Sequence, residues 1–292
     1  MTKVKKHPTF SIIVPAFNRK ETISLCLNAL LKQTYFKDDF EIIVVNNNST
    51  DGTDKIVSKF PVRCLRESKQ GAYAARNKGI KAAQGKWLVF TDSDCIPDKN
   101  WLKGFSQYIE DDKIGCLAGR VIHLKTKTYL DSLIKRSKAV NQKRALSHSF
   151  LPFAVTANVA YRREVFQKIG KFDKNLTMSG DMDFSWRMQL ETDWKIKYVP
   201  QAIVYHRPRQ NLKDFLWQIK GYGLGEKTIE KKYQLPLNFF SRLKRTLGYL
   251  VLIPLRLLFL PIIKLYNKSE SVVIILFDFL YNFFFLWGRY SR

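Results

Sequence analysis

The sequence is poor in acidic residues and in cysteines, and both shortages exclude classes of protein. Its 292 residues include 50 lysines and arginines but only 25 aspartates and glutamates, which leaves a formal net charge of +25. This excess predicts an anionic partner, such as nucleotide phosphates, nucleic acid or an acidic membrane face. The four cysteines lie far apart with no Cys-x-x-Cys pair, so neither a disulfide framework nor a zinc site is indicated. We therefore expect a reducing compartment.

The amino-terminal residues also lack a long apolar run. Residues 1–8 lead directly into a strand pattern. A secretory signal needs an apolar stretch at this place, so we expect the amino-terminal part to stay in the cytoplasm. The chain as a whole is 46% hydrophobic, which is enough for a sizeable core, and its length suits one large domain with an appendage.

Apolar runs of strand length alternate with helical spacing over the first third of the chain. Strand, helix and strand in succession predict right-handed crossovers in a parallel sheet. Polar loops follow the carboxyl ends of these strands, where ligands gather in open α/β sheets. The predicted strands are residues 10–15, 40–45, 61–65 and 86–90, and the predicted helices are residues 21–33, 53–60 and 71–83.

Two aspartates follow the last of these strands. Asp92 and Asp94 stand two residues apart, so both can lean the same way from the strand end. Mg²⁺ and Mn²⁺ prefer carboxylate oxygens and keep open positions for substrate phosphates. The pattern therefore predicts a cation site that meets a diphosphate, with a solvated turn as the alternative.

A second pair of aspartates stands near residue 180. Asp181 and Asp183 follow a Ser-Gly break and open a helix predicted at residues 182–190. The helix macrodipole favours negative charge in this first turn. Helix capping is therefore the role that we favour for Asp183.

Four motifs resemble, in order and in spacing, those of family 2 glycosyltransferases with a GT-A fold. The resemblance covers residues 9–210 and implies an α/β protein in which a mostly parallel, Rossmann-like sheet is flanked by helices. It also implies an enzyme that takes a nucleotide-sugar donor with Mn²⁺ or Mg²⁺. The Gln-x-x-Arg-Trp pattern of processive synthases is missing, so we expect one sugar per encounter. The motifs are Ser-Ile-Ile-Val-Pro-Ala-Phe-Asn at 11–18, Val-Asn-Asn-Asn-Ser-Thr-Asp-Gly-Thr at 45–53, Gly-Ala-Tyr-Ala-Ala-Arg-Asn at 71–77 and Phe-Thr-Asp-Ser-Asp at 90–94.

The resemblance also implies where the donor binds. Pro15 and Phe17 would flank the nucleotide base, and Asn47 would face its edge. The family more often has an acidic residue at position 46 or 47, so the amides here leave the identity of the base open. Arg76 is the expected charged contact to the nucleotide, because a guanidinium suits phosphate oxygens, and a solvated helix arginine is the alternative.

The metal and the base are assigned on the same resemblance. Asp94 would hold the divalent ion, and Asp92 would lie near the ribose or the metal. His206 ends a predicted strand where related enzymes supply a metal or diphosphate contact, with a satisfied polar group as the alternative. Asp181 matches the family's catalytic carboxylate and would take the proton of the acceptor hydroxyl. For contact with the acceptor we name Asn158, and Asp183 as the alternative to its capping role.

Two further segments have open interpretations. Residues 120–144 contain eight basic residues and one acid, which indicates a solvated surface, and a mobile flap that meets lipid phosphate or an acidic acceptor is the alternative. The glycine run at residues 221–225 interrupts a predicted helix and lacks the spacing of a dinucleotide fingerprint. We expect a hinge or loop there that closes over the donor, with Lys220 and Lys227 near phosphate.

The composition changes after Leu235. Residues 247–266 are apolar but contain Arg256 and two prolines, and residues 272–288 are apolar and aromatic but contain Asp278. Each run is near or below the length that spans a bilayer, and a central charge costs about 3 kcal/mol. We expect a pair of helices in the membrane interface, with a buried hairpin on the catalytic domain or on a partner subunit as the alternative. The basic residues expected to reach lipid phosphates are Arg242, Lys244, Arg245, Arg289 and Arg292.

Together these patterns predict a catalytic domain at residues 1–235 and membrane-associating helices at residues 236–292. The predicted protein is an inverting, metal-dependent glycosyltransferase of the bacterial envelope glycan type. We place it at the cytoplasmic face of the membrane, with a lipid-linked or other glycan acceptor in polysaccharide biosynthesis, an anionic membrane surface as partner and no nucleic acid. One rival is a sugar nucleotidyltransferase, which should open on a glycine-rich loop that residues 15–18 do not provide. The other is a non-catalytic basic protein that binds membrane or nucleic acid.

Overall fold

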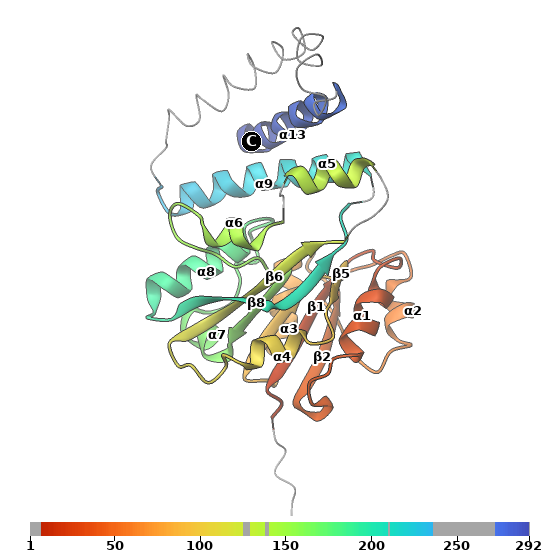
Figure 1. Ribbon diagram of the computed structural model, residues 1–292, viewed down its shortest axis with the longest axis vertical. Coiled ribbons are helices and arrows are strands. Elements are labelled where there is room, and N and C mark those ends of the chain that lie inside the picture. The colour runs from red at the N-terminus through yellow and green to blue at the C-terminus, as the bar shows by residue number, and fades with distance from the viewer. Residues whose placement is uncertain (1–6, 125–128, 138–139, 210, 236–271, 292) are drawn as a thin grey trace, which may run out of the picture. The chain divides into compact units, whose positions relative to one another are not determined.

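The computed structural model describes residues 7–124, 129–137, 140–209, 211–235 and 272–291 (Figure 1). The chain forms two compact units. The first comprises residues 1–125 and 140–208, and the second comprises residues 126–139 and 209–292. The functional division expected at residue 235 stays a prediction, and the apolar run at residues 247–266 lies outside the described residues.

One eight-stranded sheet organises the first unit, in the order β3-β2-β1-β4-β7-β6-β8-β5. Neighbouring strands from β3 to β4 are parallel, as the alternating sequence pattern predicts, and β6 is parallel to β8. Only β7 and β5 run the other way. The sheet is therefore mostly parallel. Its strands are β1 (Phe10–Ala16), β2 (Phe40–Asn46), β3 (Arg63–Arg66), β4 (Trp87–Thr91), β5 (Cys95–Pro97), β6 (Ile114–His123), β7 (Asn158–Arg162) and β8 (Lys195–His206).

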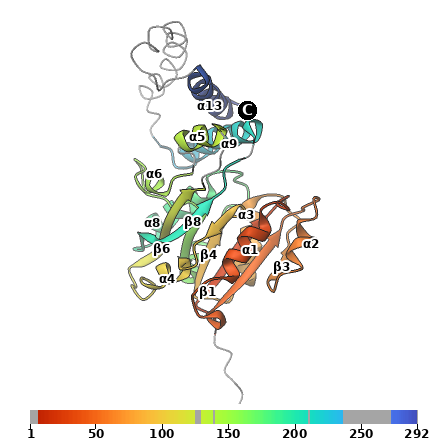
Figure 2. The same ribbon diagram turned by 45° about the vertical axis from the view of Figure 1, so that its right-hand side comes forward.

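Helices cover both faces of this sheet, because the buried strands are apolar on both sides. On one face Ile12 and Val14 of β1 belong to a core cluster with residues of α1, α2 and α4. Figure 2 shows α1 across this face of β1 and β4. Ile13 points to the other face, where α3 lies so close that a side chain at Gly79 would overlap it. The helices of this unit are α1 (Ile23–Leu31), α2 (Thr53–Val57), α3 (Ala72–Ala82), α4 (Trp101–Ser106), α6 (Gln142–Leu146), α7 (Arg163–Ile169) and α8 (Gly180–Glu191), with a short 3-10 turn at Lys37–Asp39.

An aromatic cluster joins α7 and α8 to the second face of the sheet. Phe90 of β4 meets Tyr161, Phe166 and Phe172 with ring centroids 5.5 to 6.4 Å apart. Phe184 of α8 stacks on Phe166 at 4.6 Å. Aromatic contacts of this kind add to the burial energy, so they fix the amino-terminal half of α8 against the sheet.

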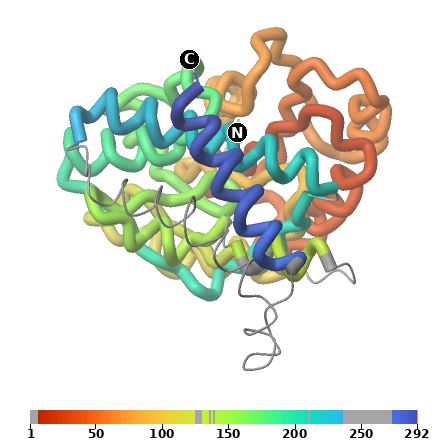
Figure 3. The backbone as a smooth tube through the Cα atoms, turned by 90° about the horizontal axis from the view of Figure 1, so that it is seen from above, coloured from red at the N-terminus to blue at the C-terminus, as the bar shows by residue number. Residues whose placement is uncertain are grey.

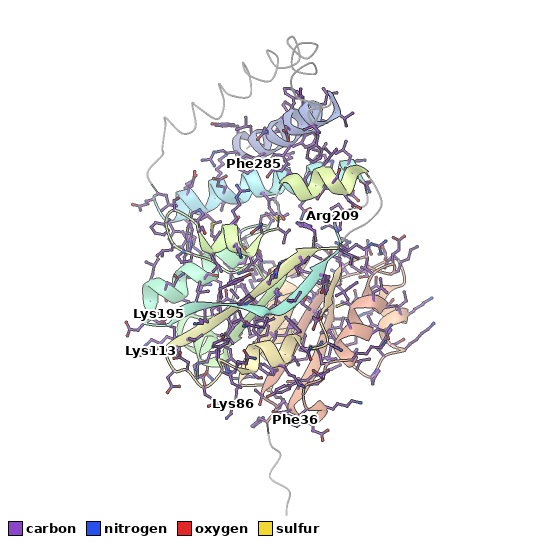
Figure 4. All side chains as sticks on the ribbon, in the orientation of Figure 1. Phe36, Lys86, Lys113, Lys195, Arg209 and Phe285 are labelled. Carbon is purple, nitrogen blue, oxygen red and sulfur yellow. The ribbon has the colours of Figure 1, made fainter. Side chains whose placement is uncertain are left out.

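The two edges of the sheet differ in chemistry. Lys86, Lys113 and Lys195, labelled in Figure 4, stand at the amino-terminal ends of β4, β6 and β8. The opposite edge holds the loops that carry the predicted site residues, since the strands that lead into them are parallel. Because β7 is antiparallel and Thr91 pairs with Asn158, the first residue of β7 also belongs to that edge.

The second unit contains three described helices, α5 (Tyr129–Ser137), α9 (Leu212–Lys232) and α13 (Val272–Tyr290). Their core joins Leu133 of α5, Phe215 and Ile219 of α9 and Phe277 of α13. The basic segment at residues 120–144 therefore includes a helix with buried apolar residues. Its described basic side chains, Arg120, Lys143 and Arg144, are exposed, as expected for a solvated surface. A flap that meets lipid phosphate or an acceptor stays a prediction.

The hinge predicted at the glycine run is wrong, because α9 is one helix from Leu212 to Lys232. A side chain at Gly223 would overlap the Phe285 carbonyl oxygen of α13, and one at Gly288 would overlap the Lys220 carbonyl oxygen. Figure 3 shows α13 crossing α9. The small residues therefore serve the close approach of two helices, which local spacing alone could not show.

Candidate active site

The loops after β4 and β8 bring an aspartate and a histidine together. Cys95 pairs with His206 in the antiparallel register of β5 and β8, and Asp94 precedes Cys95. As a result, Asp94 Oδ1 lies 3.8 Å from His206 Nε2. Asp94 Oδ2 also lies 3.9 Å from Arg19 Nη2, on the loop after β1. Two loops and the end of β8 thus meet at the Asp94 carboxylate.

Asp94 and His206 fit a divalent cation as a pair of protein ligands. They offer a carboxylate oxygen and an imidazole nitrogen, which both suit Mn²⁺. His206 Nδ1 is buried and has no hydrogen-bond partner among the described residues. No group of three metal-ligating side chains occurs in the described part of the chain. The protein can therefore supply only part of a coordination shell, and such ions commonly complete theirs with water and substrate phosphates.

Two cysteines pack against the same loop. Cys26 Sγ lies 3.6 Å from the Asp92 carbonyl oxygen, and Cys95 Sγ lies 4.0 Å from Asp94 Oδ1. Burial, followed by the negative charges of Asp94 and Asp92, raises the pKa of both thiols. These raised pKa values favour the protonated thiols at neutral pH.

Arg76 reaches the other aspartate of this loop. Its Nη2 donates a hydrogen bond of 2.6 Å to Asp92 Oδ1. The arginine is almost completely buried, so it is not the solvated helix residue of the alternative interpretation. This nitrogen is committed to Asp92, and contact of Arg76 with the nucleotide stays a prediction.

Tyr73 connects Arg76 with the second acidic segment. It lies one helical turn before Arg76, whose guanidinium is 5.4 Å from the centroid of the Tyr73 ring. The Tyr73 hydroxyl accepts hydrogen bonds from the backbone N–H groups of Gly180 and Asp181, at 2.8 and 3.3 Å. It also lies 3.5 Å from Asp181 Oδ1. The first turn of α8 is therefore held against α3, on the side of the sheet where Arg76 meets Asp92.

Asp181 has a shifted pKa. Burial raises its pKa above the ordinary value, while the charge of Arg76 and hydrogen bonds from backbone N–H groups oppose the rise. Ser179, two residues before Asp181, adopts a left-handed conformation with φ of 62°. Such conformations are uncommon for residues other than glycine and recur where a loop must present a functional group. A carboxylate with a raised pKa is suited to accept a proton.

The loops after β1 and β2 are tied to each other. Asn18 Oδ1 accepts from the Thr50 N–H, and the Asn18 N–H donates to Ser49 Oγ. Pro15 lies in β1, and Phe17 is 46% exposed in the following loop, so its ring is available to a ligand. The flanking of a base by Pro15 and Phe17 stays a prediction.

Asn47 is used inside the protein. Its Nδ2 donates to the carbonyl oxygens of Glu67 and Lys69, and its Oδ1 accepts from the Gly71 N–H at 2.7 Å. The side chain is almost fully buried. Asn47 thus fixes the loop that starts α3. Its amide keeps little free hydrogen-bonding capacity for a direct contact with the edge of the base.

The two predicted acceptor contacts are also buried. Asn158 accepts from Trp101 Nε1 and donates to the carbonyl oxygens of Arg120 and Ala202. Asp183 is fully buried and accepts from Arg187 Nε at 3.1 Å. In this structure both side chains bond to groups of the protein itself. Helix capping by Asp183 and contact of either residue with an acceptor stay predictions.

Comparison with known proteins identifies the family. The sequence model of glycosyl transferase family 2 matches residues 11–170, more than half of the chain. The chain belongs to glycosyltransferase family 2. It is therefore an enzyme, a glycosyltransferase, and the resemblance of the four motifs is confirmed. Family 2 membership favours this activity over the nucleotidyltransferase and the non-catalytic basic protein.

Relatives and solved structures agree with this family. Glycosyltransferase AglE of Haloferax volcanii is 33% identical over 211 residues, which are 69% of this chain and 68% of that protein. A crystal structure of residues 1–349 of S. aureus TarS in complex with UDP is 25% identical, with a TM-score of 0.54 over 74% of this chain and 65% of that one. Mannosyltransferase PcManGT from Pyrobaculum calidifontis, in complex with GDP-Man and Mn²⁺, is 16% identical, with a TM-score of 0.64 over 97% of this chain and 86% of that one. These neighbours confirm the GT-A fold class.

Two residues of the site were missed by sequence reasoning. Tyr73 stands three residues before Arg76 in the third motif, and this helical spacing could have placed it on the same face. Arg19 follows the first motif directly, but nothing in its local pattern points to Asp94, 75 positions further along the chain.

Proposed function

We propose that this family 2 member is a membrane-associated, metal-dependent inverting glycosyltransferase. One observation carries the proposal. Acidic residues far apart in the chain are linked at one edge of the sheet, from Asp181 through Tyr73 and Arg76 to Asp92. Asp94 follows Asp92 by two residues and meets His206. A proton acceptor and a cation site at the same edge of the sheet are the two parts that sugar transfer from a diphosphate requires.

A nucleoside diphosphate sugar is the proposed donor. The solved structure of TarS holds UDP and that of PcManGT holds GDP-Man with Mn²⁺, which supports the donor class without choosing the base. We place the base near Pro15 and Phe17 and the diphosphate near Asp92, Asp94 and Arg76. Mn²⁺ or Mg²⁺ would be held by Asp94 and His206, which suit it as ligands.

Asp181 is the proposed base of the transfer step. Its carboxylate accepts the proton of an acceptor hydroxyl, whose oxygen then forms a bond to the anomeric carbon of the sugar. The bond from that carbon to the diphosphate oxygen breaks, and its electron pair leaves with the nucleoside diphosphate. In-line attack of this kind inverts the configuration, so an α-linked donor gives a β-linked product. When bound, the divalent ion neutralises the charge on the departing diphosphate.

A lipid-linked saccharide or another envelope glycan precursor is the proposed acceptor, at the cytoplasmic face of the membrane. In the described part of the chain one helix, Val273–Tyr290, is long and apolar enough to cross a membrane by length and composition. This helix and the net charge of +25 support association with an anionic membrane surface.

Donor binding and hydrolysis test the proposed roles. We would titrate UDP-glucose, UDP-N-acetylglucosamine and GDP-mannose with and without Mn²⁺, and measure release of the nucleoside diphosphate. Asp94→Ala should lose the Mn²⁺-dependent part of donor binding. Asp181→Asn should bind the donor as wild type does, and its turnover should fall about 10² to 10⁴-fold.

Asp112→Asn is the matched control, because its carboxylate is 97% exposed and the residue has no part in the site. It should behave as wild type in both assays. Normal turnover of Asp181→Asn would contradict the assignment of the base, and normal Mn²⁺ dependence of Asp94→Ala would contradict that of the metal ligand.

A further inference from the structure

α13 carries an exposed apolar stripe along its whole length. Val273, Leu276, Phe283, Trp287 and Tyr290 recur at helical spacing and therefore lie on one face. These side chains are between 41% and 62% exposed. Contiguous apolar surface of this kind marks a site of interaction with a protein or a membrane.

The other side of α13 is fixed to α9. Phe215 of α9 stacks on Phe277 at one end of the pair, with ring centroids 5.6 Å apart. Lys227 Nζ donates to the Ser291 carbonyl oxygen at the other end, at 3.0 Å. Between them the backbones approach closely at Gly223 and Phe285, and Phe285 is labelled in Figure 4. The two helices therefore bind a partner or a membrane as one packed pair.

A buried ion pair strengthens this connection. Arg289 of α13 is almost fully buried and pairs with Glu226 and Glu230 of α9. The sequence-based expectation that Arg289 reaches lipid phosphate is therefore wrong, because its guanidinium is used between the helices. The other four basic residues named for that role lie outside the described residues.

α9 is too polar to accompany α13 across a bilayer. Charged side chains are costly in the hydrocarbon core and must find partners there. α9 has exposed charges in its first turn and in its last two turns, while its middle is packed on α13. These exposed residues are Lys213, Asp214, Lys227, Lys231 and Lys232.

The composition around the stripe is that of a membrane interface. Trp217 of α9 is 48% exposed and lies 5.6 Å from Trp287, measured between ring centroids. Lys220 Nζ lies 3.6 Å from the centroid of the Trp287 ring and 4.6 Å from that of Trp217. Tryptophan and tyrosine favour the headgroup level, and lysine stems can lie along apolar surface while the ammonium faces the polar region.

We propose that α9 and α13 form a monotopic anchor, in which α13 lies in the plane of an anionic membrane interface and does not cross the bilayer. The stripe enters the acyl boundary, and the lysines of α9 meet the lipid phosphates. The proposal deepens the membrane association in the proposed function and rests on it for the identity of the partner. It does not depend on the catalytic roles of Asp94 or Asp181.

Vesicle partitioning tests the partner. Full-length protein should bind vesicles of phosphatidylcholine with phosphatidylglycerol more tightly than vesicles of phosphatidylcholine alone. In a triple variant with Leu276→Gln, Phe283→Gln and Trp287→Gln, the partition coefficient onto these vesicles should fall by about tenfold or more. Phe36→Gln is the matched control, because Phe36 is a 78% exposed aromatic residue of the first unit, and it should partition as wild type does. Equal partitioning of the triple variant and the wild type would overturn the proposal.

Depth measurements then separate lying from crossing. In a Cys64→Ser background, which removes the exposed cysteine, a nitroxide is attached in turn at Leu276→Cys, Phe283→Cys and Tyr290→Cys. The first and last positions are about 21 Å apart along the helix axis. A helix in the interface puts all three labels at one shallow depth. Depths that differ by most of that distance would show a crossing helix and overturn the proposal.

Donor hydrolysis without vesicles distinguishes failure of the anchor from failure of the enzyme. Hydrolysis with no vesicle binding overturns the anchor and leaves the glycosyltransferase intact. Vesicle binding at one shallow depth with no hydrolysis supports the anchor and contradicts the proposed catalytic site.

Discussion

Each unit of this protein buries an arginine against acids from a neighbouring element. The two arrangements differ in whether a nearby carboxylate is left without an ion-pair partner. In the first unit Arg76 donates to Asp92, and no ion pair is recorded for Asp181 in the described part of the chain. In the second unit Arg289 forms ion pairs with both Glu226 and Glu230. Burial raises the pKa of Asp181, which its neighbours only partly offset. Asp181 is partly buried and has a raised pKa, which is typical of functional sites, whereas the acids that share Arg289 hold two helices together.

The largest expected effect on stability comes from breaking the pair in the second unit. Arg289→Ala leaves two partly buried glutamates without their cation and should lower the free energy of unfolding by about 3 kcal/mol. Urea unfolding followed by tryptophan fluorescence measures this loss. A triple variant with Glu226→Gln, Glu230→Gln and Arg289→Met should recover most of it.

Arg66→Ala is the control for this experiment. Arg66 pairs with Asp54 at 3.4 Å, but its side chain is 82% exposed. An exposed pair contributes little, so the loss should stay below about 1 kcal/mol. Equal losses in the two arginine variants would show that burial does not set the strength of the Arg289 contacts.

Removal of the Tyr73 hydroxyl should have a smaller effect on stability and a specific effect on turnover. Tyr73→Phe leaves the N–H groups of Gly180 and Asp181 without their acceptor and should cost about 1 to 2 kcal/mol. Because the hydroxyl positions the first turn of α8, turnover should fall while donor affinity stays unchanged. Tyr35→Phe also removes a hydroxyl beside a carboxylate, that of Asp39, and should leave turnover unchanged. A loss of turnover in both variants would contradict the claim that the Tyr73 hydroxyl specifically positions the first turn of α8.

The smallest expected effect is a gain in stability, and it depends on pH. Because the pKa of Asp181 is raised in the folded protein, its contribution to stability is fully present below the ordinary carboxyl pKa of about 3.9 and is lost as pH rises through the folded value. An asparagine carries no charge to bury. Asp181→Asn should therefore be more stable than wild type at pH 7, and the gain should vanish near pH 4. Urea midpoints at both values measure it, and a destabilised variant at pH 7 would contradict the raised pKa.

The outcome of the sequence predictions depends on how far apart the interacting residues lie. The parallel strands and the helices between them follow from local periodicity, and so does the position of Asp92 and Asp94 at a strand end. The Asn47 and Asn158 side chains were predicted to face ligands, but in the packed protein their amides form hydrogen bonds with backbone groups. The glycine run was predicted as a hinge, yet it lies inside a continuous helix.

The sequence by itself determined the alternating sheet, the edge at which polar loops gather, and the family, because these depend on apolar spacing and on short motifs that the chain carries locally. Only the tertiary structure decided that Tyr73 joins Asp181 to Arg76, that His206 meets Asp94, and that Arg289 serves helix packing instead of lipid. Those contacts join residues 59 to 112 positions apart. No local pattern encodes which partner a polar side chain will have. The partner depends on which other polar groups already have hydrogen-bond partners when helices and strands pack together.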